Sequence, residues 1–125
     1  MLQQLAFRDV EVEGSDLAVE LDVDDRVRNP RGALQGGLVA TLVDVVAGRA
    51  VLVGGPRDGV ATADLSIHFL RGLTEGPARA VATVVRRGRR TAVVTVDVLD
   101  MGTGALCAVA TVAFSVAPAP ADRLP

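Results

Sequence analysis

Residues 35–52 read QGGLVATLVDVVAGRAVL and predict one long helix that begins after a pair of glycines. The run from Leu38 is long enough for about four turns, and the GGP at 54–56 is a stop signal. On a helical wheel the large apolar side chains gather on one side, and the small residues gather on the other with a single acid, Asp44. The large apolar side comprises Val39, Leu42, Val43 and Val46. Such a helix is expected to be buried, so the carboxylate must be paired, hydrogen-bonded or used in chemistry.

The composition fits one globular domain. The chain has 125 residues, half of them apolar, which is enough to bury a core. A net charge of −2 and a near absence of aromatic residues disfavour nucleic-acid binding. No uninterrupted apolar run reaches the ~18 residues of a membrane span. With one cysteine and no signal pattern at the N-terminus, we expect a cytoplasmic protein that binds neither nucleic acid nor membrane and has no multi-cysteine metal site.

The remaining periodic stretches predict strands. Residues 5–13 and 17–23 alternate loosely around Gly14 and predict a first hairpin. The apolar residues in 24–34, DDRVRNPRGAL, follow neither a helical nor a strand period, which predicts a loop that leads directly into the helix. Four later stretches predict antiparallel strands with hairpin-like spacing. They are residues 62–69, 78–87, 91–100 and 106–116.

Together these elements predict a single α+β domain over residues 1–116, followed by a frayed tail at 117–125. One face of the helix would cover the sheet. The face that carries Asp44 would then need another cover, and a second copy of the protein is the simplest one.

Four separated motifs occur in one order along the chain. They are Asn29-x6-Gly36-Gly37-x6-Asp44, TADLSIHFLRG at 62–72, RGRRTAVV at 87–94 and ALCAVATVAFSV at 105–116. Over roughly residues 5 to 116 they resemble the hot-dog-fold acyl-CoA thioesterases of the phenylacetate-degradation type, a 4-hydroxybenzoyl-CoA thioesterase-like family. The resemblance implies a hot-dog fold, with one long central helix wrapped by a curved antiparallel sheet of about six strands. It also implies a homodimer or a homotetramer built as a dimer of dimers, with the active site at the dimer interface.

The resemblance further implies hydrolysis of a coenzyme A thioester to the free acid, with coenzyme A as part of the substrate and no cofactor or metal. It places the carboxylate, as general base or nucleophile, on Asp44, and the carbonyl-binding backbone N–H on Gly36. It places a loop amide on Asn29 and a strand hydroxyl on Thr62. The family commonly has His-Gly-Gly before the helix, whereas this chain has Gln35 in place of the His. A Gln can still position a carbonyl or a water, but it cannot titrate near neutrality.

Each of these residues also has a plain structural interpretation. The Gly-Gly pair would expose backbone N–H groups at the positive end of the helix dipole, where an oxyanion could bind. In the plain interpretation, the two glycines only relieve steric crowding where the chain enters the helix. Asp44 could pair with Arg49 or with an arginine of another subunit. Thr62 is a favourable strand residue, and Asn29 before a proline is typical of turns.

Further residues are candidates for substrate contact, among them Gln35 and Gly37 at the start of the helix. His68 would share a strand face with Thr62 and line the pocket rather than act as a base. Cys107, among Ala and Val, is expected to be a packed core thiol.

The basic turn at 86–90 is a solvated hairpin tip in its plain interpretation. The resemblance instead implies that Arg87, Arg89 and Arg90 contact coenzyme A phosphates, which guanidinium groups match well.

Two functions stay open at this point. The first is a coenzyme A thioester hydrolase that acts through Asp44. The alternative is a non-catalytic hot-dog protein that binds an acyl-CoA or an aromatic ligand, which Gln35 makes conceivable. A hydratase on the same fold would pair an Asp with a His, and His68 lies on a different element from Asp44.

Overall fold

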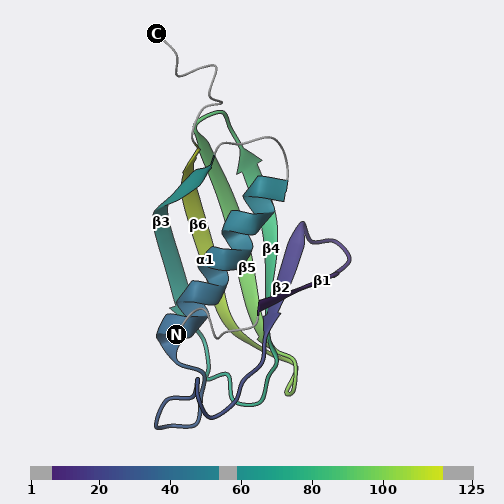
Figure 1. Cartoon of the computed structure of the whole chain (residues 1–125), viewed down its shortest axis with the longest axis vertical. Coiled ribbons are helices and arrows are strands. Elements are labelled where there is room, and N and C mark those ends of the chain that lie inside the picture. Colours follow the sequence, from purple (N-terminus) through teal and green to yellow (C-terminus); the bar gives the residue numbers. More distant parts are fainter. Residues whose placement is uncertain (1–6, 54–58, 117–125) are drawn as a thin grey trace.

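In the computed structural model, one helix lies across a single antiparallel sheet of six strands (Figure 1). The structure describes residues 7–53 and 59–116, so the predicted tail at 117–125 and the predicted stop signal at 54–56 lie outside it. The elements are β1 (Phe7–Val10), β2 (Leu17–Leu21), α1 (Gly36–Val53), β3 (Val60–Phe69), β4 (Ala78–Arg87), β5 (Thr91–Asp100) and β6 (Ala105–Val116). The predicted hot-dog architecture is confirmed.

The strand order, β1-β2-β4-β5-β6-β3, places β3 at one edge of the sheet. Although β3 directly follows α1 in the sequence, it pairs with the last strand, β6. In Figure 1 β3 and β6 lie on one side of the helix, and β4 and β2 lie on the other. The outer edge of β3 has no neighbouring strand among the described residues, and an unpaired edge of this length is usually covered or paired in a native protein.

The helix packs on the sheet through the large apolar side that its periodicity predicts. Its buried residues are Leu38, Val39, Leu42, Val43, Val46, Ala47, Ala50 and Val51. Beneath it, β4 presents Ala78, Ala80 and Ala82, whose short side chains let the helix approach the sheet closely. By length and mean hydropathy (1.8), α1 would also qualify as a membrane span, a property that it shares with helices buried in protein cores.

The small-residue side of α1 is only partly covered within one chain. Gly36 and Gly37 are exposed, and Thr41, Asp44 and Gly48 are half-buried. Ala47, which the wheel places on this side, is fully buried. The open strip therefore runs from the N-terminus of the helix past Asp44, on the side that faces β3.

Candidate active site

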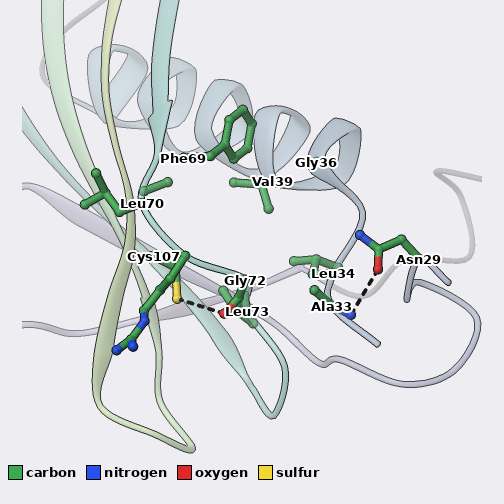
Figure 2. A pocket seen from close by; sticks show the side chains of 12 residues that line it. Asn29, Ala33, Leu34, Gly36, Val39, Phe69, Leu70, Gly72, Leu73 and Cys107 are labelled. Carbon is green, nitrogen blue, oxygen red and sulfur yellow. Dashed lines mark hydrogen bonds between the residues drawn. The ribbon is translucent and has the colours of Figure 1, made fainter. Parts of the chain in front are cut away.

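The loop before the helix is held by the side chain of Asn29. Its Oδ1 accepts hydrogen bonds from the backbone N–H groups of Arg31 (3.0 Å) and Ala33 (3.1 Å), and its own backbone N–H donates to the carbonyl of Ala33 (2.7 Å). These bonds fix the orientation of the carboxamide. The Nδ2 group donates to no acceptor among the described residues, and Figure 2 shows the carboxamide close to the start of the helix.

The start of the helix offers free backbone donors. The carbonyl of Gln35 accepts the N–H groups of Leu38 (3.0 Å) and Val39 (3.1 Å), so Gln35 is the N-cap residue. The N–H groups of Gly36 and Gly37 have no acceptor in the described part of the chain. Gly36 also lies against the ring of Phe69, which is 3.8 Å from the point that a Cβ would occupy. This helix end can therefore bind a negatively charged or polarised oxygen.

Asp44 is hydrogen-bonded to a hydroxyl and not to a cation. Thr62 on β3 donates from Oγ1 to Asp44 Oδ1 at 2.7 Å. Arg49, the predicted alternative partner, instead forms an ion pair with Asp9 on β1 at 2.9 Å. Among the described residues, Asp44 forms no ion pair within 4 Å. The charge of this half-buried carboxylate is thus supported by one neutral donor and by solvent.

A β-bulge brings Thr62 to the helix side of the sheet. Thr62 pairs with Phe114, but Asp64 pairs with the next residue, Ala113, so Ala63 is the extra residue. The ring of Phe114 is buried and lies 3.8 Å from the Cβ position of Gly48 on α1, which identifies this face as the helix side.

The bulge also moves His68 away from the site. Past the bulge, alternation continues in the opposite phase, and His68 pairs with Val109, five residues from Phe114 on β6. Paired residues of adjacent strands point to the same face. The prediction that His68 shares a face with Thr62 is wrong, because one extra residue reverses the direction of every side chain that follows. Within one chain, His68 is exposed on the sheet face opposite Asp44.

The basic turn divides into two kinds of arginine. The guanidinium of Arg87 donates to the carbonyl of Val51 at 2.6 Å and to that of Ala50 at 3.4 Å, so it caps the last turn of α1. Arg89 and Arg90 are exposed between β4 and β5. In Figure 1 this hairpin end lies beside the C-terminal end of α1. The length of an 18-residue helix, about 27 Å, therefore separates the tip from Gly36.

A pocket that the sequence did not reveal lies next to Gly36. Its volume is about 320 Å³, and Figure 2 shows it between the start of α1, the end of β3 and β6. Its lining includes Leu34, Val39, Phe69, Leu73, Cys107 and Ala108. Cys107 is 3% exposed, which confirms the predicted packed thiol. Burial raises its pKa, and its Sγ donates to the carbonyl of Gly72 at 3.7 Å, so it contributes a neutral wall rather than a thiolate nucleophile.

Known proteins share this architecture. A structure of thioesterase HI1161 from Haemophilus influenzae superposes with a TM-score of 0.85 at 24% identity, covering 94% of this chain and 82% of that one. A structure of BH2602 from Bacillus halodurans, determined with coenzyme A, superposes with a TM-score of 0.78 at 31% identity, covering 90% of this chain and 74% of that one.

Sequence comparison also finds relatives that are named as esterases. The candidate esterase SSO1253 from Saccharolobus solfataricus is 34% identical over 91 residues, which is 72% of this chain and 59% of that protein. The candidate esterase F42H10.6 from Caenorhabditis elegans is 37% identical over 81 residues, 64% of this chain. This chain thus spans only about half of the length of these curated relatives (59% and 48%). The profile of the thioesterase superfamily matches residues 31–107, more than half of the chain, and the chain belongs to that superfamily.

Proposed function

We propose that this protein is an acyl-CoA thioesterase of the phenylacetate-degradation type, with Asp44 as its reactive carboxylate. The observation that carries the proposal is the environment of Asp44. A carboxylate in a structural ion pair has a cation beside it. Among the described residues, Asp44 has no such cation: it receives a hydrogen bond from Thr62 and lies half-buried on the strip along α1. That environment suits a base or a nucleophile.

Thioester hydrolysis requires two groups at the same carbonyl carbon. Asp44 either removes a proton from the attacking water or attacks the carbonyl itself, and the Thr62 hydroxyl keeps one carboxylate oxygen in place while the other reacts. The N–H of Gly36, with the Nδ2 group of Asn29 nearby, stabilises the negative charge that develops on the carbonyl oxygen. The thiolate of coenzyme A then leaves, and the acyl group departs as the free acid.

One chain cannot supply both groups to one carbonyl. Gly36 and Asp44 are eight residues apart on the same helix, which places them about 12 Å apart along its axis. An attacking group and an oxyanion donor must each lie about 3 Å from the reacting atoms. We therefore infer that the site forms between two copies, with Gly36 from one chain and Asp44 from the other, in a homodimer or a dimer of dimers. The outer edge of β3, which pairs with no strand in residues 7–53 and 59–116, and the open strip along α1 provide the surface for this contact.

Coenzyme A is the thiol half of the proposed substrate. A protein 31% identical to this one was crystallised with coenzyme A, and the exposed Arg89 and Arg90 offer two guanidinium groups to its phosphates. Because this turn lies far from Gly36 of its own chain, we expect it to serve a site that contains Gly36 of the other copy.

The test is an assay that detects the free thiol of released coenzyme A over a panel of acyl-CoAs, with the Asp44→Asn protein as the blank. Release that depends on Asp44 supports the proposal. Tight binding of acyl-CoA without release would favour the alternative, a non-catalytic acyl-CoA-binding protein in which Gln35 replaces the usual histidine.

A further inference from the structure

The face of the sheet that points away from α1 carries a row of hydroxyl side chains across four strands. Thr83 on β4 pairs with Thr95 on β5. Thr95 in turn pairs with Thr111 on β6, and Thr111 pairs with Ser66 on β3. All four residues are exposed in one chain, and paired residues point to the same face. This hydroxyl row therefore crosses the outer face roughly at right angles to the strands.

The rest of the outer face is mostly apolar. Apolar side chains flank the hydroxyl row on both sides, among them Val81, Val93, Leu99, Leu106, Val109 and Ala113. On β3 to β6 this face carries five ionisable side chains, which are Asp64, His68, Arg79, Arg86 and Asp97. Arg79, at the rim, is already paired with Glu20 at 2.6 Å. A flat face that is rich in Val and Thr and poor in charge is typical of the core of a protein interface.

The four other charged or titratable groups are arranged symmetrically about the hydroxyl row. On β3, Ser66 lies midway between Asp64 and His68. Arg86 is in register with Asp64 on one side of the row, and Asp97 is in register with His68 on the other. Each side of the row thus carries one acid and one base. Among the described residues of one chain, none of the four forms an ion pair within 4 Å.

We propose that this outer face docks on the same face of a second copy, with a two-fold axis along the hydroxyl row. The rotation exchanges the two sides of the row. It brings His68 over the partner's Asp64 and Asp97 beside the partner's Arg86, so every acid meets a base. An imidazole N–H can donate to a carboxylate whether the ring is charged or neutral. Each hydroxyl of the row lies on its own copy, and a hydroxyl can both donate and accept.

This contact deepens the proposed assembly, because it selects the dimer of dimers and supplies its second interface. It rests on the proposed contact at the edge of β3, and not on hydrolysis. An axis along the hydroxyl row runs across the strands and therefore crosses that same edge. Two perpendicular two-fold axes that meet give a closed tetramer, whereas axes that do not meet give an open chain.

The outer face is large enough for a stable contact. β3, β4 and β5 have ten residues each, and β6 has twelve. With about 3.4 Å per residue and about 4.8 Å between strands, the four strands present roughly 650 Å². A dimer carries two such faces, so its contact with a second dimer exceeds the about 800 Å² per partner of a standard interface.

The first experiment measures mass by light scattering at micromolar concentration for the wild type and for Thr95→Arg. Arginine at this position places a bulky charge in the middle of the hydroxyl row, where it meets its own copy. We expect the wild type to have the mass of four chains and Thr95→Arg the mass of two, with turnover per chain kept because the β3 contact is untouched. The matched control is Thr103→Arg, in the exposed turn between β5 and β6, which should stay a tetramer.

The second experiment reverses charges and does not depend on the folding of Thr95→Arg. His68→Asp places a carboxylate over the partner's Asp64, and we expect the tetramer to dissociate into dimers at a concentration at least about tenfold higher than for the wild type. Adding Asp64→Arg to His68→Asp restores opposite charges and should restore the tetramer. If Thr95→Arg does not fold, this pair of variants decides the assignment alone.

The mass readout separates this proposal from the proposed function. If the wild type hydrolyses no thioester but both experiments halve the mass, the interface stands and the hydrolase assignment fails. The interface is overturned if Thr95→Arg has the same mass as the wild type, or if Thr103→Arg dissociates equally. It is also overturned if the double variant is no more associated than His68→Asp, or if Thr95→Arg yields monomers.

Discussion

Thr62 and Asp44 lie on different elements, eighteen positions apart, and are joined by a 2.7 Å hydrogen bond from Oγ1 to Oδ1. This contact exists only because the bulge at Ala63 directs Thr62 toward the helix. Among the described residues of one chain, Thr62 is the only side chain that hydrogen-bonds to Asp44, the proposed reactive carboxylate. This hydrogen bond is the basis for the first two predictions.

Asp44→Asn is expected to lower kcat by at least about 10²-fold, because it removes the basicity and the charge but keeps the shape. Folding should survive with a loss of about 1 kcal/mol, since no described cation is left unpaired: Arg49 is bound to Asp9. Turnover and thermal melting are measured on the same preparation, with Asp64→Asn on the other sheet face as control. Near-normal turnover with a sharply lower melting temperature would refute the catalytic role.

Thr62→Val keeps the β-branched shape and removes the hydroxyl. We expect kcat to fall by about tenfold, the equivalent of one hydrogen bond of about 1.4 kcal/mol, with little change in KM. Thr62→Ser, which restores the donor, should recover most of the rate. If valine and serine behave alike in steady-state kinetics, the hydroxyl has no positioning role.

The two-chain site predicts complementation between inactive variants. Gly36→Pro removes the N–H at a helix position that tolerates proline, and Asp44→Asn removes the carboxylate. When the two variants are co-expressed, half of the randomly formed dimers are mixed, and each has one intact site. We therefore expect about a quarter of wild-type activity per total protein. Activity that stays at the level of the separate variants would place both groups in one chain.

The same arrangement predicts the oligomeric state. Light scattering at micromolar concentration should give the mass of a dimer or a tetramer, because no strand in the described part of the chain pairs with the outer edge of β3 and the Asp44 side of α1 is only partly buried. A well-folded monomer with full activity would contradict both the assembly and the shared site.

The arginines of the basic turn should separate by function. Arg89→Ala with Arg90→Ala is expected to raise KM for full acyl-CoA more than for a short pantetheine thioester, with kcat little changed, because distant phosphate contacts bind ground and transition states alike. Arg87→Ala should instead lower stability by about 1–2 kcal/mol in urea unfolding, since it frees the last carbonyls of α1. Equal losses on both substrates would count against the coenzyme contact.

Asp100 is expected to control the stability of the end of the sheet next to the pocket. Its carboxylate is 1% exposed and accepts four backbone N–H groups, from Thr74, Glu75, Gly76 and Gly102. Burial alone would raise its pKa, but these four hydrogen bonds outweigh that effect and lower it. Asp100→Asn turns an amide NH₂ toward N–H donors and should cost about 3 kcal/mol in urea unfolding.

The lowered pKa of Asp100 also predicts how this residue changes the stability of the fold with pH. A carboxyl whose folded-state pKa is below its unfolded value of about 3.9 stabilises the fold fully above about pH 4. The contribution is lost as the pH falls through the folded-state pKa. Asp100→Asn should therefore flatten the acid limb of stability against pH, and the control is Asp97→Asn, which changes an exposed carboxylate on the same strand.

The sequence by itself determined the elements and the helix face. The period of α1 separates large from small side chains, and the alternation of the four later strands gives their bounds closely, because both patterns record local burial. The fixed rise of a helix also makes the spacing of Gly36 and Asp44 readable from the sequence alone. These residues are the core of the candidate site.

Only the tertiary structure decided which other side chains lie next to Gly36 and Asp44. The bulge at Ala63 depends on the pairing of β3 with β6, and it brought Thr62 to Asp44 while turning His68 away. The C-cap made by Arg87 and the pocket at Phe69 are contacts between segments that are distant in the sequence. Local periodicity carries no information about such contacts, because they depend on how the elements pack rather than on how each one forms.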